Sequence, residues 1–210
     1  MLTEVKNYQS APVITVHNPV GYPPKISRKQ PAPRLSSLDG KTIYLVDSRF
    51  DDSIELLKQV QIWFAEKMPG VKTELRSMAS YYGKDDPELW TEIKTRGHAA
   101  IIGVGHCSTC APAVSTHAIT LETQYGVPTV AIHTDKFVKV VQSVTRMGGL
   151  AQAPVVYVPQ PVMGKTEGNG LVNDYTRGYL VLSLKLLLAE RLGVAPEAVG
   201  GRHRSSVWCG

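Results

Sequence analysis

A short apolar run that breaks into small and reactive residues constrains this chain more than any other stretch. Residues 99–104 read Ala-Ala-Ile-Ile-Gly-Val, which is typical of a strand buried on both faces. A glycine, a histidine and the Cys-x-x-Cys of Cys107 and Cys110 follow. Residues 111–124 have the character of a helix, and Pro112 suits its first turn because an N–H has no partner there. The loop is therefore expected at the carboxyl edge of a parallel sheet, where open α/β folds hold their ligands.

The rest of the chain alternates between strand and helix patterns. Further strands are expected over 41–46, 71–76, 127–133 and 153–158, and helices over 51–67, 87–95, 136–147 and 171–192. The apolar face of the first helix is expected to consist of Ile54, Leu57, Val60, Ile62 and Phe64. Strands that alternate with helices form a parallel sheet with right-handed crossovers. The sequence therefore predicts a three-layer α/β sandwich with a mainly parallel sheet of about five strands.

The α/β domain is expected to span residues 41–194, between a proline-rich N-terminal arm over 1–40 and a tail over 195–210 that holds Cys209. So many prolines exclude helix or central strand from the arm. Its apolar residues, Val13 and Tyr22 among them, favour an ordered arm over a flexible leader. Such an arm can wrap its own domain or a neighbouring subunit, which would make a homo-oligomer.

Composition and charge limit the classes of binding partner that this protein can have. The formal net charge is +5, but no nucleic-acid-binding motif accompanies it, so we expect a solvated surface or attraction for a small anionic substrate rather than nucleic acid. No run of about 18 apolar residues is present, which excludes a transmembrane helix. Three cysteines do not make a disulfide framework. These features predict a cytoplasmic protein, where Cys-x-x-Cys pairs are more often catalytic or metal-binding than structural.

The Cys-x-x-Cys predicts reactive thiols. The positive end of a helix dipole favours thiolate over thiol, so Cys107 and Cys110 are both expected to be reactive, and His106 beside them can act as a cation or a proton acceptor. Ser108, Thr109 and the backbone N–H groups behind Cys110 are expected to hold a carboxylate or oxyanion. The alternative is a pair of inert, buried cysteines.

Two other strands are expected to contribute side chains at the same edge. The candidates are Asp47, Ser48 and Arg49 after the first strand, and His133, Thr134 and Asp135 after the fourth, with His133 as a further catalytic residue. Each has a structural alternative: the two aspartates can cap helices, His133 can be an interior histidine, and Arg49 can pair with Asp51 or Asp52. His117, in the helix after Cys110, either faces the thiols or packs.

Several segments carry a family resemblance. Residues 103–110 (Gly-Val-Gly-His-Cys-Ser-Thr-Cys), 115–122 (Ser-Thr-His-Ala-Ile-Thr-Leu-Glu) and 126–130 (Gly-Val-Pro-Thr-Val) are similar to UGSC-type proteins, as are Asn18-Pro19 and 38–41 of the leader. In that family the first position of the four-residue motif can be selenocysteine and the last is cysteine. The resemblance implies that Cys107 holds the most nucleophilic position. More distantly, the unit is similar to one half of the aspartate/glutamate racemase fold and to thiol- or selenol-bearing reductase subunits.

Three functions remain open at this point. The first is a cysteine-dependent enzyme that attacks a small electrophile, either a carboxylic acid derivative or a carbon–heteroatom bond. The second is a thiol–disulfide oxidoreductase or a reductase subunit. The third is a zinc-binding or non-catalytic subunit, against which stands the lack of a second Cys-x-x-Cys or a His-x-x-x-His. We expect the first, with no metal and no cofactor.

Overall fold

The computed structural model describes residues 25–51, 53–80 and 83–158. The expected helix over 171–192 and the tail over 195–210 lie outside these residues, as does the first part of the arm. None of the described helices is both long enough and apolar enough to cross a membrane.

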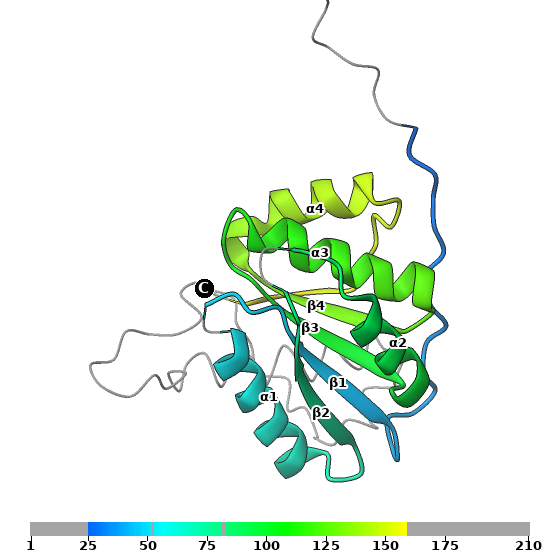
Figure 1. Cartoon of the computed structure of the whole chain (residues 1–210), viewed down its shortest axis with the longest axis vertical. Helices are drawn as coiled ribbons and strands as arrows, with labels where there is room; N and C mark the ends of the chain where they lie inside the picture. The colour runs from blue at the N-terminus through cyan, green and yellow to red at the C-terminus, as the bar shows by residue number, and fades with distance from the viewer. Residues whose placement is uncertain (1–24, 52, 81–82, 159–210) are drawn as a thin grey trace, which may run out of the picture.

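Five parallel strands form one sheet, in the order β2-β1-β3-β4-β5 (Figure 1). They are β1 (Thr42–Asp47), β2 (Lys72–Ser77), β3 (Ala99–Gly105), β4 (Thr129–Thr134) and β5 (Val155–Val158). The connections run through α1 (Ser53–Lys67), α2 (Pro87–Arg96), α3 (Cys110–Thr120) and α4 (Val138–Met147). This confirms the α/β fold with a five-stranded parallel sheet.

Helices cover both faces of the sheet. Leu56, Val60 and Phe64 of α1 pack on one face, against Leu45 and other inward-facing strand residues. The opposite face is covered by α2 and α3, and α4 packs beside α3 (Figure 1). Two apolar layers on one buried sheet explain why β3 has no exposed residue.

The helix α1 differs from its expected apolar face. Ile62 is 44% exposed, whereas Trp63 is buried. The buried apolar residues of α1 are Leu56, Leu57, Val60, Trp63 and Phe64. This spacing of three and four residues is that of a single helical stripe, and Ile62 lies outside it.

The strand β3 changes register just before the Cys-x-x-Cys. Ile101 pairs with Val130, but Gly105 pairs with His133, and the ladder shifts between Ile102 and Gly105. If the side chains of β3 alternated strictly between the two faces of the sheet, Val104 would lie on the face that α3 covers. It belongs instead to the core on the face that α1 covers. The shift turns Gly105 toward α3.

The arm is ordered over its described part, where it packs on its own domain. The buried carboxylate of Glu122 accepts hydrogen bonds from Nη1 and Nη2 of the Arg34 guanidinium, at 2.7 and 2.9 Å, and from the N–H of Ala32 at 2.7 Å. The same carboxylate accepts the N–H of Thr129 at 2.7 Å. The arm is therefore fastened near the amino end of β4, and a homo-oligomer through it stays a prediction.

Helix ends differ from the expected bounds by a few residues. The helix after the cysteines starts at Cys110, and its last five residues, Leu121–Tyr125, form a π-helical turn. That turn ends at Gly126, whose φ of 70° suits glycine. A 3-10 turn, Asp135–Phe137, precedes α4. The domain boundaries at residues 40 and 194 stay predictions.

Candidate functional site

The Cys-x-x-Cys loop lies where the sheet changes direction. β1 and β3 are neighbours, but the chain leaves β1 toward one edge of the sheet and β3 toward the other. In open α/β sheets, ligands bind outside the carboxyl ends of the strands at such a point. The segments after these two strands carry Ser48 and Cys107, respectively.

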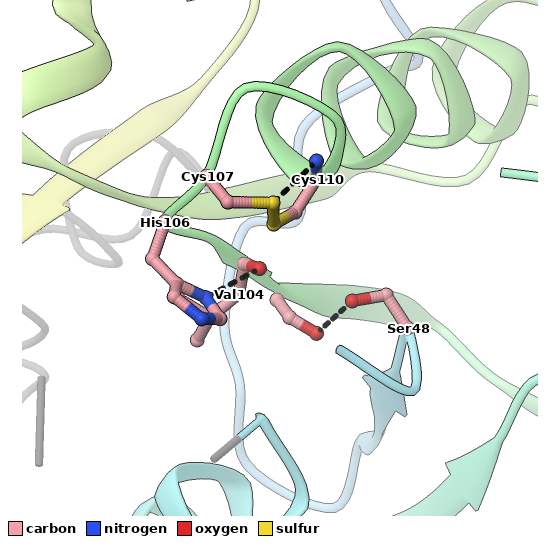
Figure 2. Close-up of a disulfide and its surroundings, with 6 residues drawn as sticks. Ser48, Val104, His106, Cys107 and Cys110 are labelled. Carbon is pink, nitrogen blue, oxygen red and sulfur yellow. Dashed lines mark hydrogen bonds between the residues drawn. A yellow bond between two sulfur atoms is a disulfide. The ribbon is translucent and has the colours of Figure 1, made fainter. Parts of the chain in front are cut away.

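Cys107 and Cys110 form a disulfide across the loop, with their Cα atoms 5.1 Å apart (Figure 2). The Cys107 side is partly exposed, whereas Cys110 is 1% exposed at the first turn of α3. The backbone N–H of Cys110 donates to the Cys107 sulfur at 3.0 Å. The N-terminus of α3 therefore points at the sulfur of Cys107, as a thiolate at this position requires. In this structure, however, that sulfur is bonded to the sulfur of Cys110.

The expected anion donors behind Cys110 are already engaged. The N–H of Ala111 donates to the carbonyl of Cys107 at 3.0 Å, and Pro112 has no N–H to offer. Ser108 and Thr109 form the exposed tip of the loop. Thr109 precedes α3 but makes no side-chain capping hydrogen bond. Donors for an oxyanion therefore have to come from the loop tip rather than from the helix interior.

The carbonyl of Gly103 accepts three hydrogen bonds, two from the loop after β1 and one from the start of α1. Ser48 donates to it from its N–H at 3.0 Å and from its Oγ at 2.7 Å. The Oγ of Ser53, the first residue of α1, donates to the same oxygen. Figure 2 shows Ser48 reaching from its loop toward the end of β3, below the disulfide. These bonds fix the loop after β1 to the strand that carries the cysteines.

Asp47 and Arg49 turn toward β2 instead of the cysteines. The Asp47 carboxylate accepts the Ser77 hydroxyl at 2.7 Å and the N–H of Arg49 at 2.9 Å. The Arg49 guanidinium donates to the carbonyl of Ala79 at 3.1 Å. Arg49 has a φ of 60°, a conformation stabilised here by its bond to Asp47. Asp47 thus holds this turn rather than capping α1.

His133 lies directly behind the loop and is fully buried. Its Nε2 is 3.3 Å from the Ser115 Oγ, which itself donates to the carbonyl of Ala111 at 2.8 Å. Its Nδ1 faces the backbone of Gly105 and has no well-aligned hydrogen-bond partner among the described residues. Burial lowers the pKa of His133 to about 4, so the ring is neutral at physiological pH. Because the His133 ring is fully buried between Gly105 and Ser115, its role here is to pack against the base of the Cys-x-x-Cys loop.

Two other histidines lie away from the sulfurs, and for His117 this selects the second of the two expected alternatives. The His106 Nδ1 lies 3.3 Å from the Val104 carbonyl, and its ring is turned away from the sulfurs (Figure 2). His117 is buried against the Trp90 ring, with centroids 5.5 Å apart, and so it packs. Burial lowers the pKa of His117, which the carboxylates of Asp85 and Asp86 partly oppose.

The end of β4 contributes less than expected. Thr134 is fully buried. The Asp135 carboxylate is about half exposed and lies 3.9 Å from the Nζ of Lys136. Asp135 lies within the 3-10 turn, which Thr134 precedes, so it does not cap a helix either.

Three serines shape the site but were not among the expected residues. Ser53 holds the Gly103 carbonyl, Ser77 holds Asp47, and Ser115 holds His133. Only Ser53 had a signal in the sequence, because a serine at the start of a helix is a common capping residue. The other two become visible only when the strands and helices are assembled.

Within the described part of the chain, no group of three His, Cys, Asp or Glu side chains is placed to hold a metal ion. The two cysteines are bonded to each other, and His133 faces Gly105 and Ser115.

Curated relatives match short segments of this chain. A cyclic amide hydrolase of Azorhizobium caulinodans is 57% identical over 49 residues, which are 23% of this chain and 13% of that protein. A cyanuric acid amidohydrolase of Enterobacter cloacae is 58% identical over 41 residues, which are 20% of this chain and 11% of that protein. The chain thus matches only a small part of the length of these relatives.

Among solved structures, an FMN-dependent cysteine decarboxylase superposes with a TM-score of 0.40 and 11% identity, over 70% of this chain and 98% of that one. So slight a likeness bears on neither fold nor function. The profile of the UGSC family, in contrast, matches residues 15–171, which include most of the arm, the sheet and the Cys-x-x-Cys. This chain is a member of the UGSC family.

Proposed function

We propose that this protein is a hydrolase that opens a small, anionic cyclic amide, with the Cys107 thiolate as the nucleophile. The observation that carries the proposal is the N–H of Cys110, which lies 3.0 Å from the Cys107 sulfur at the start of α3. A charge-assisted bond at a helix N-terminus favours thiolate over thiol. The amidohydrolase and cyclic amide hydrolase relatives support a carbon–nitrogen bond as the target.

The reaction starts from the reduced pair, so a dithiol reductant first supplies two electrons and two protons to the disulfide. The Cys107 thiol releases its proton to solvent, and the resulting thiolate attacks the amide carbonyl carbon, so that a carbon–sulfur bond forms. When the carbon–nitrogen bond breaks, the nitrogen takes the proton of the Cys110 thiol. Water attacks the thioester and gives one proton to Cys110 and the other to solvent, which releases the carboxylate and the Cys107 thiolate.

The loop is built to hold such a thiolate in place. Ser48 and Ser53 fix the Gly103 carbonyl, and His133 with Ser115 supports the first turn of α3. The exposed loop tip, Ser108 and Thr109, offers hydroxyl and N–H donors for the oxyanion of the tetrahedral intermediate. A site held this way needs little reorganisation during the reaction.

Ring opening by the reduced protein tests the proposal. Cyanuric acid and a panel of small cyclic imides are incubated with protein kept in a dithiol reductant, and ring opening is followed by mass spectrometry. We expect turnover of at least one of them, strongly reduced when the disulfide is restored by oxidation. Equal turnover by reduced and oxidised protein would exclude Cys107 as the nucleophile.

The disulfide itself favours a second candidate, which is thiol–disulfide exchange. In that reaction the two thiols pass two electrons and two protons to a substrate disulfide, and the Cys107–Cys110 bond reforms. Cys110→Ser separates the two candidates. Exchange requires both sulfurs and stops in this variant, whereas amide hydrolysis keeps partial turnover or accumulates an acyl group on Cys107.

A further inference from the structure

A cavity of about 720 Å³ lies between the arm and the loop that joins α4 to β5. Its walls include Ile26, Arg28, Lys29, Arg146, Leu150 and Gln152. This volume is within the range of about 300–1,000 Å³ that is typical of small-molecule sites.

The cavity is separate from the Cys-x-x-Cys loop. On the domain side the cavity is lined by Arg146, in the last turn of α4, and by residues 149–152, which precede β5 and so lie at the amino edge of the parallel sheet. Cys107 follows β3 and lies at the carboxyl edge. None of the described residues that line the cavity belongs to the candidate site.

The two walls are fastened to each other by the backbone. The N–H of Lys29 donates to the carbonyl of Gly149 at 2.8 Å. Gly149 has a φ of 83°, and a Cβ there would overlap the carbonyl oxygen of Ser27, so the close approach requires glycine. Further along the arm, the bidentate pair between Arg34 and Glu122 holds the same segment to the domain. The cavity is therefore a defined feature of the fold.

The lining combines unbalanced positive charge with apolar surface. Arg28, Lys29 and Arg146 all border the cavity, and no described carboxylate pairs with them. None of the described lining residues is acidic. Ile26 is 46% exposed, which is unusual for its type, and it lines the cavity together with the nearly buried Leu150.

We propose that this cavity binds a small organic anion, namely a carboxylate or phosphonate on an apolar or aromatic body, at a site distinct from the thiols. The three cations attract and orient the anionic group, and Ile26 and Leu150 contact the apolar body. Neither feature alone selects such a ligand: inorganic phosphate lacks the apolar body, and a neutral aromatic amide lacks the charge.

Amide chemical shifts of the full chain test the site with defined probes. Benzoate and phenylphosphonate are titrated into ¹⁵N-labelled protein, with benzamide and inorganic phosphate as matched comparisons. We expect saturable shifts at the amides of Lys29 and Gly149 with the two aromatic anions. Binding of benzamide and of inorganic phosphate should each be at least about fivefold weaker. Added salt should weaken the binding of the anions because it screens exposed charges.

A double variant and a control on the same helix complete the test. Arg28→Gln with Arg146→Gln should weaken phenylphosphonate binding about tenfold, whereas Lys139→Gln, which removes a charge from α4 outside the cavity, should change it less than about twofold. Cys107→Ser should leave this binding unchanged, which separates the inference from the proposed function. Shifts absent from Lys29 and Gly149, equal binding of benzamide, equal loss in Lys139→Gln, or binding of a polyglutamate peptide but not of the small anions would each overturn the proposal.

Discussion

The imidazole of His133 packs against the backbone of Gly105, the last residue of the strand that leads to the cysteines. A Cβ at position 105 would overlap Nδ1 of His133 and lie 3.0 Å from the Cα of Ala111. His133 thus fills the space between the end of β3 and the first turn of α3. The absence of a side chain at Gly105 is what allows a ring to sit directly behind the Cys-x-x-Cys loop.

Gly105→Ala should therefore destabilise the fold and disturb the loop together. The added methyl meets a buried ring and backbone, neither of which can move freely, so we expect a loss of roughly 2 kcal/mol in the free energy of unfolding. Urea unfolding measures it. In a His133→Ala background the same substitution should cost less, because part of the overlap is gone. Full additivity of the two substitutions would contradict this packing.

Stability should fall as the pH is lowered from about 6.5 toward 4. His133 has a pKa of about 4 in the folded state and about 6.5 when unfolded, so the unfolded chain binds the extra proton in this window. The contribution of His133 to the free energy of unfolding is fully present above pH 6.5, and it is lost as the pH falls to the folded-state pKa of about 4. The loss in the free energy of unfolding that His133 causes over this pH range has an upper limit on the order of 3 kcal/mol. His117, whose pKa burial also lowers, adds in the same direction.

Urea midpoints measured at several pH values for the wild type and for His133→Gln check this expectation. The variant should be less stable at pH 7 but should lose less stability than the wild type on acidification. Parallel pH curves for the two proteins would show that His133 does not titrate in this way.

Glu122→Gln should loosen the arm. The substitution removes a buried charge that faces Arg34 and replaces one acceptor oxygen by a donor that points at N–H groups. Loss of one partner of a buried ion pair costs about 3–5 kcal/mol, and partial exposure of Arg34 places this one at the lower end. Limited proteolysis within residues 25–40 should accelerate at the same time.

Glu55→Gln is the matched control for the arm. It removes an exposed carboxylate that pairs with Lys58 within α1, and pairs of this kind contribute about 0.3–0.5 kcal/mol. Unchanged cleavage of the arm in Glu122→Gln, or equal acceleration in Glu55→Gln, would contradict the anchoring role of Glu122.

The sheet and the position of the Cys-x-x-Cys could be predicted from the sequence because their signals are local. Residues 99–104 are apolar without interruption, glycine ends the run, and Pro112 marks the following helix. Alternation of strands and helices then determines the parallel sheet. The strand order places the loops after β1 and β3 side by side, which brings Ser48 and Cys107 to the same edge of the sheet.

Side-chain directions at that edge could not be predicted in the same way. Asp47 and Arg49 turn toward β2 because Ser77 and the carbonyl of Ala79 are available there, and these lie 30 residues along the chain. The register shift in β3 before Gly105 leaves no periodic pattern in the sequence from which it could be predicted. The bond between Arg34 and Glu122 joins residues 88 positions apart, and nothing local distinguishes this pair from other opposite charges.

The proposed hydrolysis requires that Cys107 form a covalent intermediate with the substrate. The most direct measurement is intact mass and peptide mapping of the reduced Cys110→Ser variant during incubation with the cyclic amide that the wild type opens. We predict an added mass equal to the substrate, attached at Cys107, because the protonated partner that assists turnover is gone. Cys107→Ser should show neither adduct nor ring opening, since its hydroxyl stays protonated without a strong base. Ring opening by Cys107→Ser at the rate of the wild type would contradict the claim.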